Sequence, residues 1–264
     1  MYHSLYICDG VNGSVTNHWT DLLQNSVNTW DDWHIIPEKR PVVSPPEIKT
    51  QIIDLPGGHG FVDLSEIITN DVRYGQRQGS WTFIAHPDYS DIEPWNWKYE
   101  AIAQKIHGRN LKIILEDDPF YFYEGRLKVN QWDPGENWSK VTIDYTLQPF
   151  KQEIIISDAP WLWDPFSFVD GIIRSYSGLT VTAGTPKTVE VRSGAKKVIP
   201  TFVLGSAQDS LTVCVSHDGG TTWSTPETMT YPNCRFRSIK LSYTSILKFT
   251  GTGSVTIQFR GEWL

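Results

Sequence analysis

Three adjacent acidic residues, Glu116, Asp117 and Asp118, form a compact group of side chains that could do chemistry. Carboxylate oxygens suit hard divalent cations, so the group has the right atoms for a metal site. Consecutive side chains on a strand point to opposite faces, however, and Pro119 follows directly, which indicates a turn. The spacing therefore favours a solvated acidic turn, and no metal ligand is predicted.

Other candidate groups lead to the same conclusion. Glu124 and Arg126 lie two residues apart, which favours an ion pair or an interface contact over an acid–base couple. Gly57, Gly58 and Gly60 lack the Lys-Ser/Thr of a phosphate-binding loop and predict a glycine-rich turn. Residues 86–91, HPDYSD, are the nearest approach to a ligand set, but the histidines show no helical pair and no Cys-His cluster. No catalytic residue, cofactor-binding residue or cofactor is predicted, which argues against an enzyme.

Residues 216–223, SHDGGTTW, fit the Asp-box pattern S-x-D-x-G-x-T-W that sialidases carry. The Asp218 carboxylate can accept backbone N–H groups across a turn made by Gly219 and Gly220, with Trp223 packing beneath. In sialidases the motif is repeated around a propeller, whereas here it occurs once. We therefore expect a folding role for it and no catalytic one.

Composition predicts a chain made mainly of β-strands. Hydrophobic residues make up 39%, aromatic residues 13% and charged residues only 20%, and the apolar runs are short. The formal charge is −7, divided as −8 over residues 1–152 (21 acids, 13 Lys/Arg) and +1 over residues 153–264 (9 acids, 10 Lys/Arg). With the change in composition, this predicts an N-terminal domain at 1–152, a linker at 153–168 and a C-terminal domain at 169–264.

Three further features concern the environment of the chain. The start, MYHSLYICDG, lacks a basic region followed by an apolar run, so no secretory leader is expected. No apolar run is long enough for a membrane span. The sparse, odd set of cysteines predicts buried free thiols in a reducing cytoplasm; they are Cys8, Cys214 and Cys234.

Periodicity places the elements. Apolar residues at helical spacing between Pro94 and Gly108 predict one helix over 94–108. Strands are expected in the first half at 49–56, 79–86, 111–117, 121–132 and 140–150, with a proline-rich extended arm at 38–49. In the second half, strands are expected at 187–193, 198–205, 211–217, 236–243, 246–251 and 254–261, with turns at HDGG and GTG. Their spacing predicts a β-sandwich.

Four segments of the first half form an ordered series of motifs, at 28–66, 74–83, 107–129 and 138–151. This series resembles the distal tail protein (Dit-like) family of long-tailed phages that infect Gram-positive bacteria. The C-terminal half, ending in LKFTGTGSVTIQFRGEWL, is similar to the galectin-like or carbohydrate-binding-module-like sandwiches appended in that family. The N-terminal domain is then expected to be a β-sandwich or split barrel that builds a ring.

The resemblance implies a structural virion protein that forms a ring, commonly a hexamer, around a channel through which DNA passes without specific binding. Implied partners are the tail-tube protein, the tail-associated hub protein and adsorption or receptor-binding proteins; the location is the virion tail, after assembly in the host cytoplasm. An acidic ring would repel DNA phosphates and so avoid retaining the genome. Candidate subunit-interface residues are Trp30, Trp33, Val42, Val43, Pro45 and Pro46. Ordinary core packing is the alternative for the two tryptophans, and the proline arm is the favoured contact.

Two rival functions remain open at this point. A carbohydrate-binding module or adsorption protein recognising host-surface glycans would use exposed aromatic side chains, and Trp223 and Trp263 are the candidates for sugar stacking. A glycosidase would need paired carboxylates across a cleft, and the sequence nominates no pair.

Overall fold

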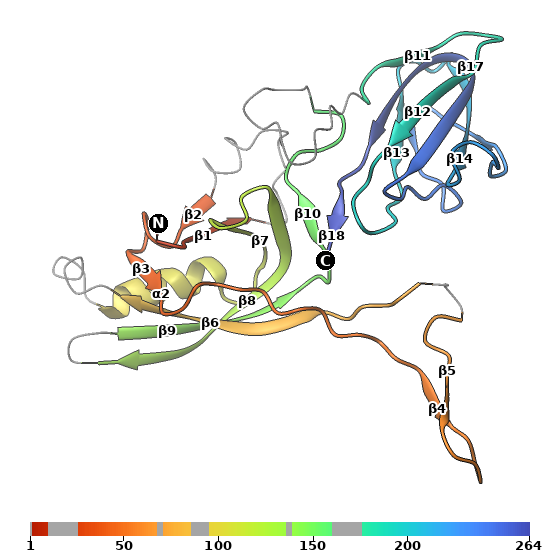
Figure 1. Cartoon of the computed structure of the whole chain (residues 1–264). Coiled ribbons are helices and arrows are strands. Elements are labelled where there is room, and N and C mark those ends of the chain that lie inside the picture. Colours follow the sequence, from red (N-terminus) through yellow and green to blue (C-terminus); the bar gives the residue numbers. More distant parts are fainter. Residues whose placement is uncertain (1, 10–25, 68–70, 86–94, 136–138, 160–175) are drawn as a thin grey trace. The chain divides into compact units, whose positions relative to one another are not determined.

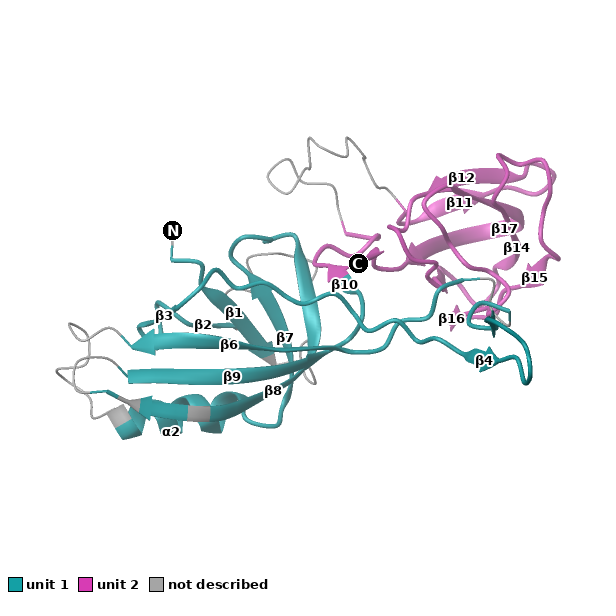
Figure 2. Cartoon of the chain, turned by 60° about the horizontal axis from the view of Figure 1, so that its bottom comes forward, with its two compact units in different colours: residues 1–14, 23–151, 264 teal, residues 15–22, 152–263 magenta. Residues whose placement is uncertain are grey.

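The computed structural model describes residues 2–9, 26–67, 71–85, 95–135, 139–159 and 176–264. These divide into two compact units (Figures 1 and 2). Unit 1 comprises the described residues up to Lys151 together with Leu264, and unit 2 comprises those from Gln152 to Trp263. The segment 160–172, at the expected boundary, lies outside the described residues, and the domain limits stay a prediction.

Unit 1 is built on one antiparallel sheet that curls around its core. Seven strands pair in the order β2-β1-β7-β8-β9-β6-β3. Each long strand alternates buried and exposed side chains, so one face of the sheet is apolar. The strands are β1 (Leu5–Asp9), β2 (Ser26–Asn28), β3 (Ile35–Pro37), β6 (Arg77–Ala85), β7 (Asn110–Leu115), β8 (Tyr121–Pro134) and β9 (Ser139–Leu147).

The helix α2 (Trp95–Ile106) covers the apolar face of this sheet. Ile102 and Ile106 are fully buried in the same core cluster as Leu127 of β8. Gly108 ends the helix with a φ of 74°, a left-handed conformation that glycine adopts without steric cost. The helix expected at 94–108 is confirmed, as are the strands expected at 79–86, 111–117, 121–132 and 140–150.

Unit 2 is also antiparallel and has one core. A single long strand, β17 (Ser245–Gln258), pairs with four others. Its first part lies between β12 (Lys187–Val191) and β14 (Ser210–Ser216), and its last part lies between β11 (Leu179–Val181) and β13 (Thr201–Leu204). The short strands β15 (Glu227–Thr228) and β16 (Asn233–Cys234) extend the two sides.

The glycines of GTG bend β17 and do not end it, so the turn expected there is wrong. Gly251 and Gly253 have φ angles of 121° and 148°, which the strand uses to pass from one side of the core to the other. The rings of Phe202 and Phe249, which come from the two sides, meet edge to face with centroids 6.0 Å apart.

The strand expected at 236–243 is also wrong. Phe236, Ile239 and Leu241 all point into the core, and their spacing of three and then two residues does not fit strand alternation. A turn, closed by the Ile239 N–H to the Phe236 carbonyl at 3.2 Å, brings them inward together. Only Leu241 forms a ladder contact, as an isolated bridge to Val198.

The mainly β fold with one helix is confirmed for the described residues. Cys8 and Cys214 are buried free thiols and Cys234 is partly buried and free. No helix among the described residues is long and apolar enough to cross a membrane.

Candidate assembly interface

A two-stranded hairpin extends from unit 1 and belongs to neither main sheet (Figure 1). It consists of β4 (Ile52–Asp54) and β5 (Phe61–Asp63), joined through a turn in which Gly57 and Gly60 have positive φ angles of 75° and 98°. The glycine-rich turn is therefore as expected, but the strand expected at 49–56 is shorter.

Both faces of this hairpin are apolar and exposed. Ile53 pairs with Val62, and Phe61 lies opposite Asp54 beside Ile52, so large side chains project to each side. Phe61 is 60% exposed and Ile53 is 49% exposed. The segment 48–67 carries seven of the fourteen exposed large hydrophobic side chains in the described residues. An isolated hairpin is marginal in water, so these side chains indicate a surface that a partner covers.

The proline-rich arm before the hairpin is attached to its own unit. The Trp81 indole N–H donates to the Val42 carbonyl at 3.1 Å, and the Arg77 guanidinium donates to the Ser44 carbonyl at 2.8 Å. The Ser44 N–H in turn donates to the Tyr145 hydroxyl at 3.0 Å. These bonds satisfy backbone groups that a strand would otherwise pair. Backbone hydrogen bonds from Gly75 to Glu47 and from Lys49 to Arg73 continue the attachment, so the arm has a fixed path as far as Lys49.

The six predicted interface residues differ in how far they are exposed. Trp33 and Val43 are buried in the core cluster of unit 1, where they have little surface to offer a neighbour. Trp30 is half-buried and stacks on Tyr2, with centroids 4.0 Å apart. Three of the six residues remain on or near the surface of the arm: Val42 and Pro45 are exposed, and Pro46 is half-buried.

Each acid of the Glu116–Asp118 group has its own protein partner. Glu116 accepts hydrogen bonds from the Ser4 N–H and hydroxyl at 2.7 and 2.9 Å. Asp117 accepts from Arg40 at 2.8 Å and from His3 at 2.9 Å, and Asp118 accepts from Lys151 at 2.6 Å. The Arg40 hydrogen bond, helped by His3, holds the pKa of the Asp117 carboxyl below its ordinary value.

These partners make the acidic stretch a structural element. No cluster of His, Cys, Asp and Glu in the described part of the chain could hold a metal ion. Residues 86–91 lie outside that part.

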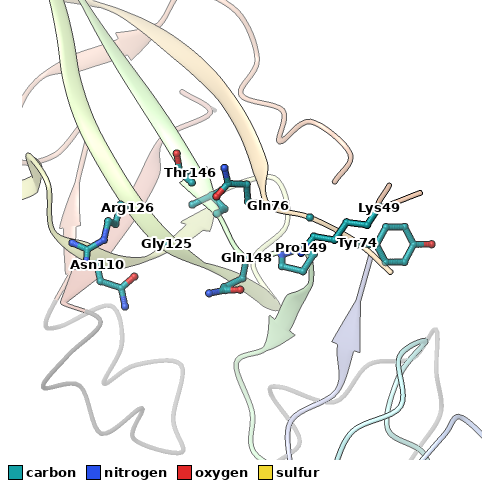
Figure 3. A pocket seen from close by; sticks show the side chains of 11 residues that line it. Lys49, Tyr74, Gln76, Asn110, Gly125, Arg126, Thr146, Gln148 and Pro149 are labelled. Carbon is teal, nitrogen blue, oxygen red and sulfur yellow. The ribbon is translucent and has the colours of Figure 1, made fainter. Parts of the chain in front are cut away.

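An open groove of about 500 Å³ lies in unit 1 near the base of the hairpin (Figure 3). Lys49 and Tyr74 lie toward one end, Arg126 and Asn110 lie toward the other, and Gln148 lies between them. The lining contains no Asp, Glu or His, and its ionisable groups are Lys49, Tyr74 and Arg126. Glu124 and Arg126 contact different groups: Glu124 accepts from Asn110 at 3.1 Å, and Arg126 donates to the Gly108 carbonyl at 2.7 Å.

The Asp box forms the hairpin turn between β14 and β15. The Asp218 carboxylate accepts the Thr222 N–H at 2.9 Å, the Thr222 hydroxyl at 2.6 Å and the Ser216 hydroxyl at 2.7 Å. Hydrogen bonds from Thr222 and then from Ser216 hold the pKa of Asp218 far below its ordinary value. The Lys248 ammonium lies 5.2 Å from the Trp223 ring centroid, so a cation already contacts this candidate for sugar stacking.

We expect Asp218→Asn to destabilise unit 2 at neutral pH, because the charged carboxylate accepts bonds that an amide cannot all accept. The folded-state pKa is depressed, so this stabilisation is present above the unfolded pKa and is lost as the pH falls from about 4 toward the folded value. Urea unfolding of the parent and of Asp218→Asn across this pH range tests the prediction. The difference between their free energies of unfolding should narrow on acidification, and a difference that does not depend on pH contradicts the assignment.

The second candidate for sugar stacking, Trp263, belongs to a clasp between residues 152–158 and 257–263 of unit 2. Its indole N–H donates to the Glu153 carboxylate at 3.1 Å. Arg260 donates to the Glu153 and Ile154 carbonyls, and burial lowers the pKa of Arg260 to about 10. Glu153 and Gln152 lie in β10 (Lys151–Glu153), which pairs with β18 (Glu262–Trp263). The early part of the expected linker is thus ordered against the end of the chain.

No protein-family model and no curated protein matches the sequence. Among solved structures, the chain is similar to the Dit protein of phage SPP1, described as a paradigm of the hub adsorption apparatus in phages that infect Gram-positive bacteria. The TM-score is 0.58 at 16% identity, and the match covers 98% of this chain and 99% of that chain. The chain has the Dit fold. The resemblance predicted from the ordered motifs is thereby confirmed at the level of the fold.

Sequence reasoning predicted a glycine-rich turn at the tip of the hairpin. It missed that the hairpin and its flanks carry most of the exposed large hydrophobic side chains in the described part of unit 1. The available signal was the pair of apolar runs, KTQIIDL and FVDL, on either side of Gly57, Gly58 and Gly60. Two short apolar runs around a glycine turn predict a hairpin, but only the structure shows that none of the described elements of unit 1 covers it.

Proposed function

We propose that this chain is a distal tail protein that forms a ring, commonly a hexamer in proteins of this kind, between the tail tube and the baseplate or tip. The Dit fold over nearly the whole length supports this role, because the SPP1 protein with that fold belongs to a hub adsorption apparatus. The role is architectural, in the virion tail, and involves no enzymatic activity.

The observation that carries the proposal is the set of exposed apolar side chains on the hairpin and its flanks, residues 48–67. A monomer would leave its two apolar faces in water, whereas a neighbouring subunit would bury them. In a closed ring, the hairpin of each subunit packs against the next subunit, so the apolar side chains of every hairpin are buried. Val42 and Pro45 are exposed on the arm that leads to the hairpin and are the predicted interface residues that best fit this contact.

The ring would surround a channel for DNA and would stack on other tail components. We propose the tail-tube protein, the tail-associated hub protein and adsorption or receptor-binding proteins as its partners. The excess of acids over bases in residues 1–152 is compatible with a channel that does not retain DNA. Neither tryptophan proposed for sugar stacking is free of protein contacts, so carbohydrate recognition has no specific support.

Particle mass by light scattering, together with negative-stain imaging, tests the ring. A closed particle with a central hole is the expected result, either alone or after mixing with the tail-tube protein. A strict monomer under both conditions, at high protein concentration, would overturn the proposal.

A further inference from the structure

The hairpin formed by β4 and β5 has two unlike faces. Residues directly opposite each other in an antiparallel pair lie on the same face. On one face the two strands carry only apolar side chains, those of Ile53 and Val62. The other face, which we call the mixed face, carries four exposed side chains, those of Ile52, Asp54, Phe61 and Asp63.

The charged groups of the hairpin are carboxylates. Residues 50–67 contain Asp54, Asp63 and Glu66 but no Lys or Arg. Asp54 and Asp63 are diagonal neighbours on the mixed face, which places them about 7–8 Å apart. Neither forms a salt bridge among the residues that the structure describes. The mixed face therefore offers two carboxylates beside two large apolar side chains.

The groove of unit 1 has the complementary composition. Its two cations, Lys49 and Arg126, are exposed and lie toward opposite ends (Figure 3). No salt bridge in the described part of the chain involves either of them. Arg73 adds a third cation at the Lys49 end, since its carbonyl accepts the Lys49 N–H at 2.9 Å.

Two carboxylates lie at the margin of the groove. Glu124 is engaged, because it accepts the Asn110 amide at 3.1 Å. Glu47 lies beside Gly75, whose N–H donates to the Glu47 carbonyl at 2.6 Å. The cations at the two ends are therefore open to carboxylates from outside the subunit.

The groove also has a fixed aromatic wall. The Tyr74 ring meets Phe150 edge to face, with centroids 5.6 Å apart, and both residues are half-buried. This contact holds Tyr74 in place at the Lys49 end, where an apolar side chain can pack on it.

We infer that the groove of one subunit receives the mixed face of the hairpin of a second copy of this chain. The inference rests on the ring proposed above and names the surface that receives the hairpin. Asp54 and Asp63 bind the cations at the two ends of the groove, and the apolar side chains beside them pack on Tyr74. Complementary charge fixes the register of such a contact.

The hairpin does not reach the groove of its own subunit. Lys49 lies just before β4, at the base of the hairpin, and the hairpin extends away from this base (Figure 1). A hairpin and a groove at different places on one subunit join copies head to tail, which builds a ring when the rotation closes. A contact between two hairpins would instead be self-complementary and would stop at a dimer.

A pair of charge-reversal variants of the full chain tests the contact under the conditions in which the parent forms rings. The groove variant is Lys49→Glu/Arg126→Glu, and the hairpin variant is Asp54→Lys/Asp63→Lys. Each alone should weaken the subunit contact at least about tenfold, because attraction becomes repulsion. Lys187→Glu, an exposed lysine at the start of β12, is the control and should leave the particle mass unchanged.

Mixing the two variants in equal amounts should restore the rings. Each acidic hairpin then meets a basic groove and each basic hairpin an acidic groove, which an even-numbered ring of alternating subunits allows. Light scattering should give the particle mass of the parent for the mixture and a smaller mass for each variant alone. Circular dichroism of each variant first establishes that it is folded. For a variant that is not folded, the single change Lys49→Glu or Asp54→Lys takes its place.

The outcomes separate this contact from the ring itself. If the parent forms rings but the groove variant assembles equally well, or if mixing restores nothing, the inference is overturned and the ring stands. Assembly that stops at dimers in the parent assigns the hairpin to a contact with another hairpin and also overturns the inference. A parent that stays monomeric overturns the proposed function, and this inference with it.

Discussion

The double variant Ile53→Ser/Phe61→Ser is expected to lose the ring and to behave as a monomer that is folded as well as the parent. One side chain lies on each face of the hairpin, and both are about half exposed or more within the subunit. Fully burying a large apolar side chain contributes about 1.5–3 kcal/mol, and about half of each side chain remains to be buried, so the two changes should weaken each subunit contact by at least about tenfold. Light scattering over a range of concentrations measures this effect.

Trp97→Ser is the matched control for the hairpin variant. Trp97 lies on α2 and is 62% exposed, which is similar to Phe61, but it is far along the chain from the hairpin. This substitution should leave the particle mass unchanged. Thermal unfolding of the isolated subunits should hardly change in either protein, since exposed substitutions usually alter stability by about 0.5 kcal/mol or less. A hairpin variant that still forms rings would show that another surface joins the subunits.

Gly251→Ala is expected to cause the largest loss of stability of any single methyl addition that we consider in unit 2. The residue has a φ of 121°, which L-amino acids with a side chain rarely adopt, and a Cβ there would overlap the Ser210 carbonyl oxygen of β14. Backbone strain of about 1–3 kcal/mol adds to the overlap, so the loss should reach about 3–5 kcal/mol. Hydrogen exchange of β13 and β14 in increasing urea measures the stability of unit 2 within the whole protein.

Gly184→Ala separates strain from overlap. Gly184 also has a positive φ, 79°, but a Cβ there would meet no atom within 4 Å. This variant should lose only about 1 kcal/mol. If Gly251→Ala and Gly184→Ala lower the free energy of unfolding by the same amount, the close approach of β14 to the bend in β17 does not determine the stability of the unit.

Local patterns were sufficient for the regular parts of the fold. The helix at 95–106 and the strands β6, β8 and β9 follow from apolar periodicity, because each presents one buried face to a single core. Strand β7 follows from a short, continuous apolar run, since it is buried on both faces. The wrong predictions fall where a glycine or a turn breaks the link between apolar spacing and the type of element. GTG reads as a turn but bends a continuous strand, and 236–243 reads as a strand although a turn places its apolar residues inward.

Sequence reasoning about the interface was less complete, because exposure depends on what the rest of the unit covers. Trp33 and Val43 look like candidates for a sticky surface, yet they complete the core of their own unit. Ile53 and Phe61 look like ordinary strand residues, yet both are exposed and belong to neither core cluster of the described residues. The sequence contains both sets of apolar residues, and only the folded unit distinguishes them.

The long strand β17 also determines how unit 2 can open. Four strands pair with it, two along each part, so loss of β17 from one side of the core also removes a strand from the other side. Amides in β11 and β12, which lie on different parts of β17, should therefore exchange through a common opening with one free energy, as a single cooperative foldon. On this expectation, partly opened forms of unit 2 are rare, and proteolysis of the unit proceeds through the common opening.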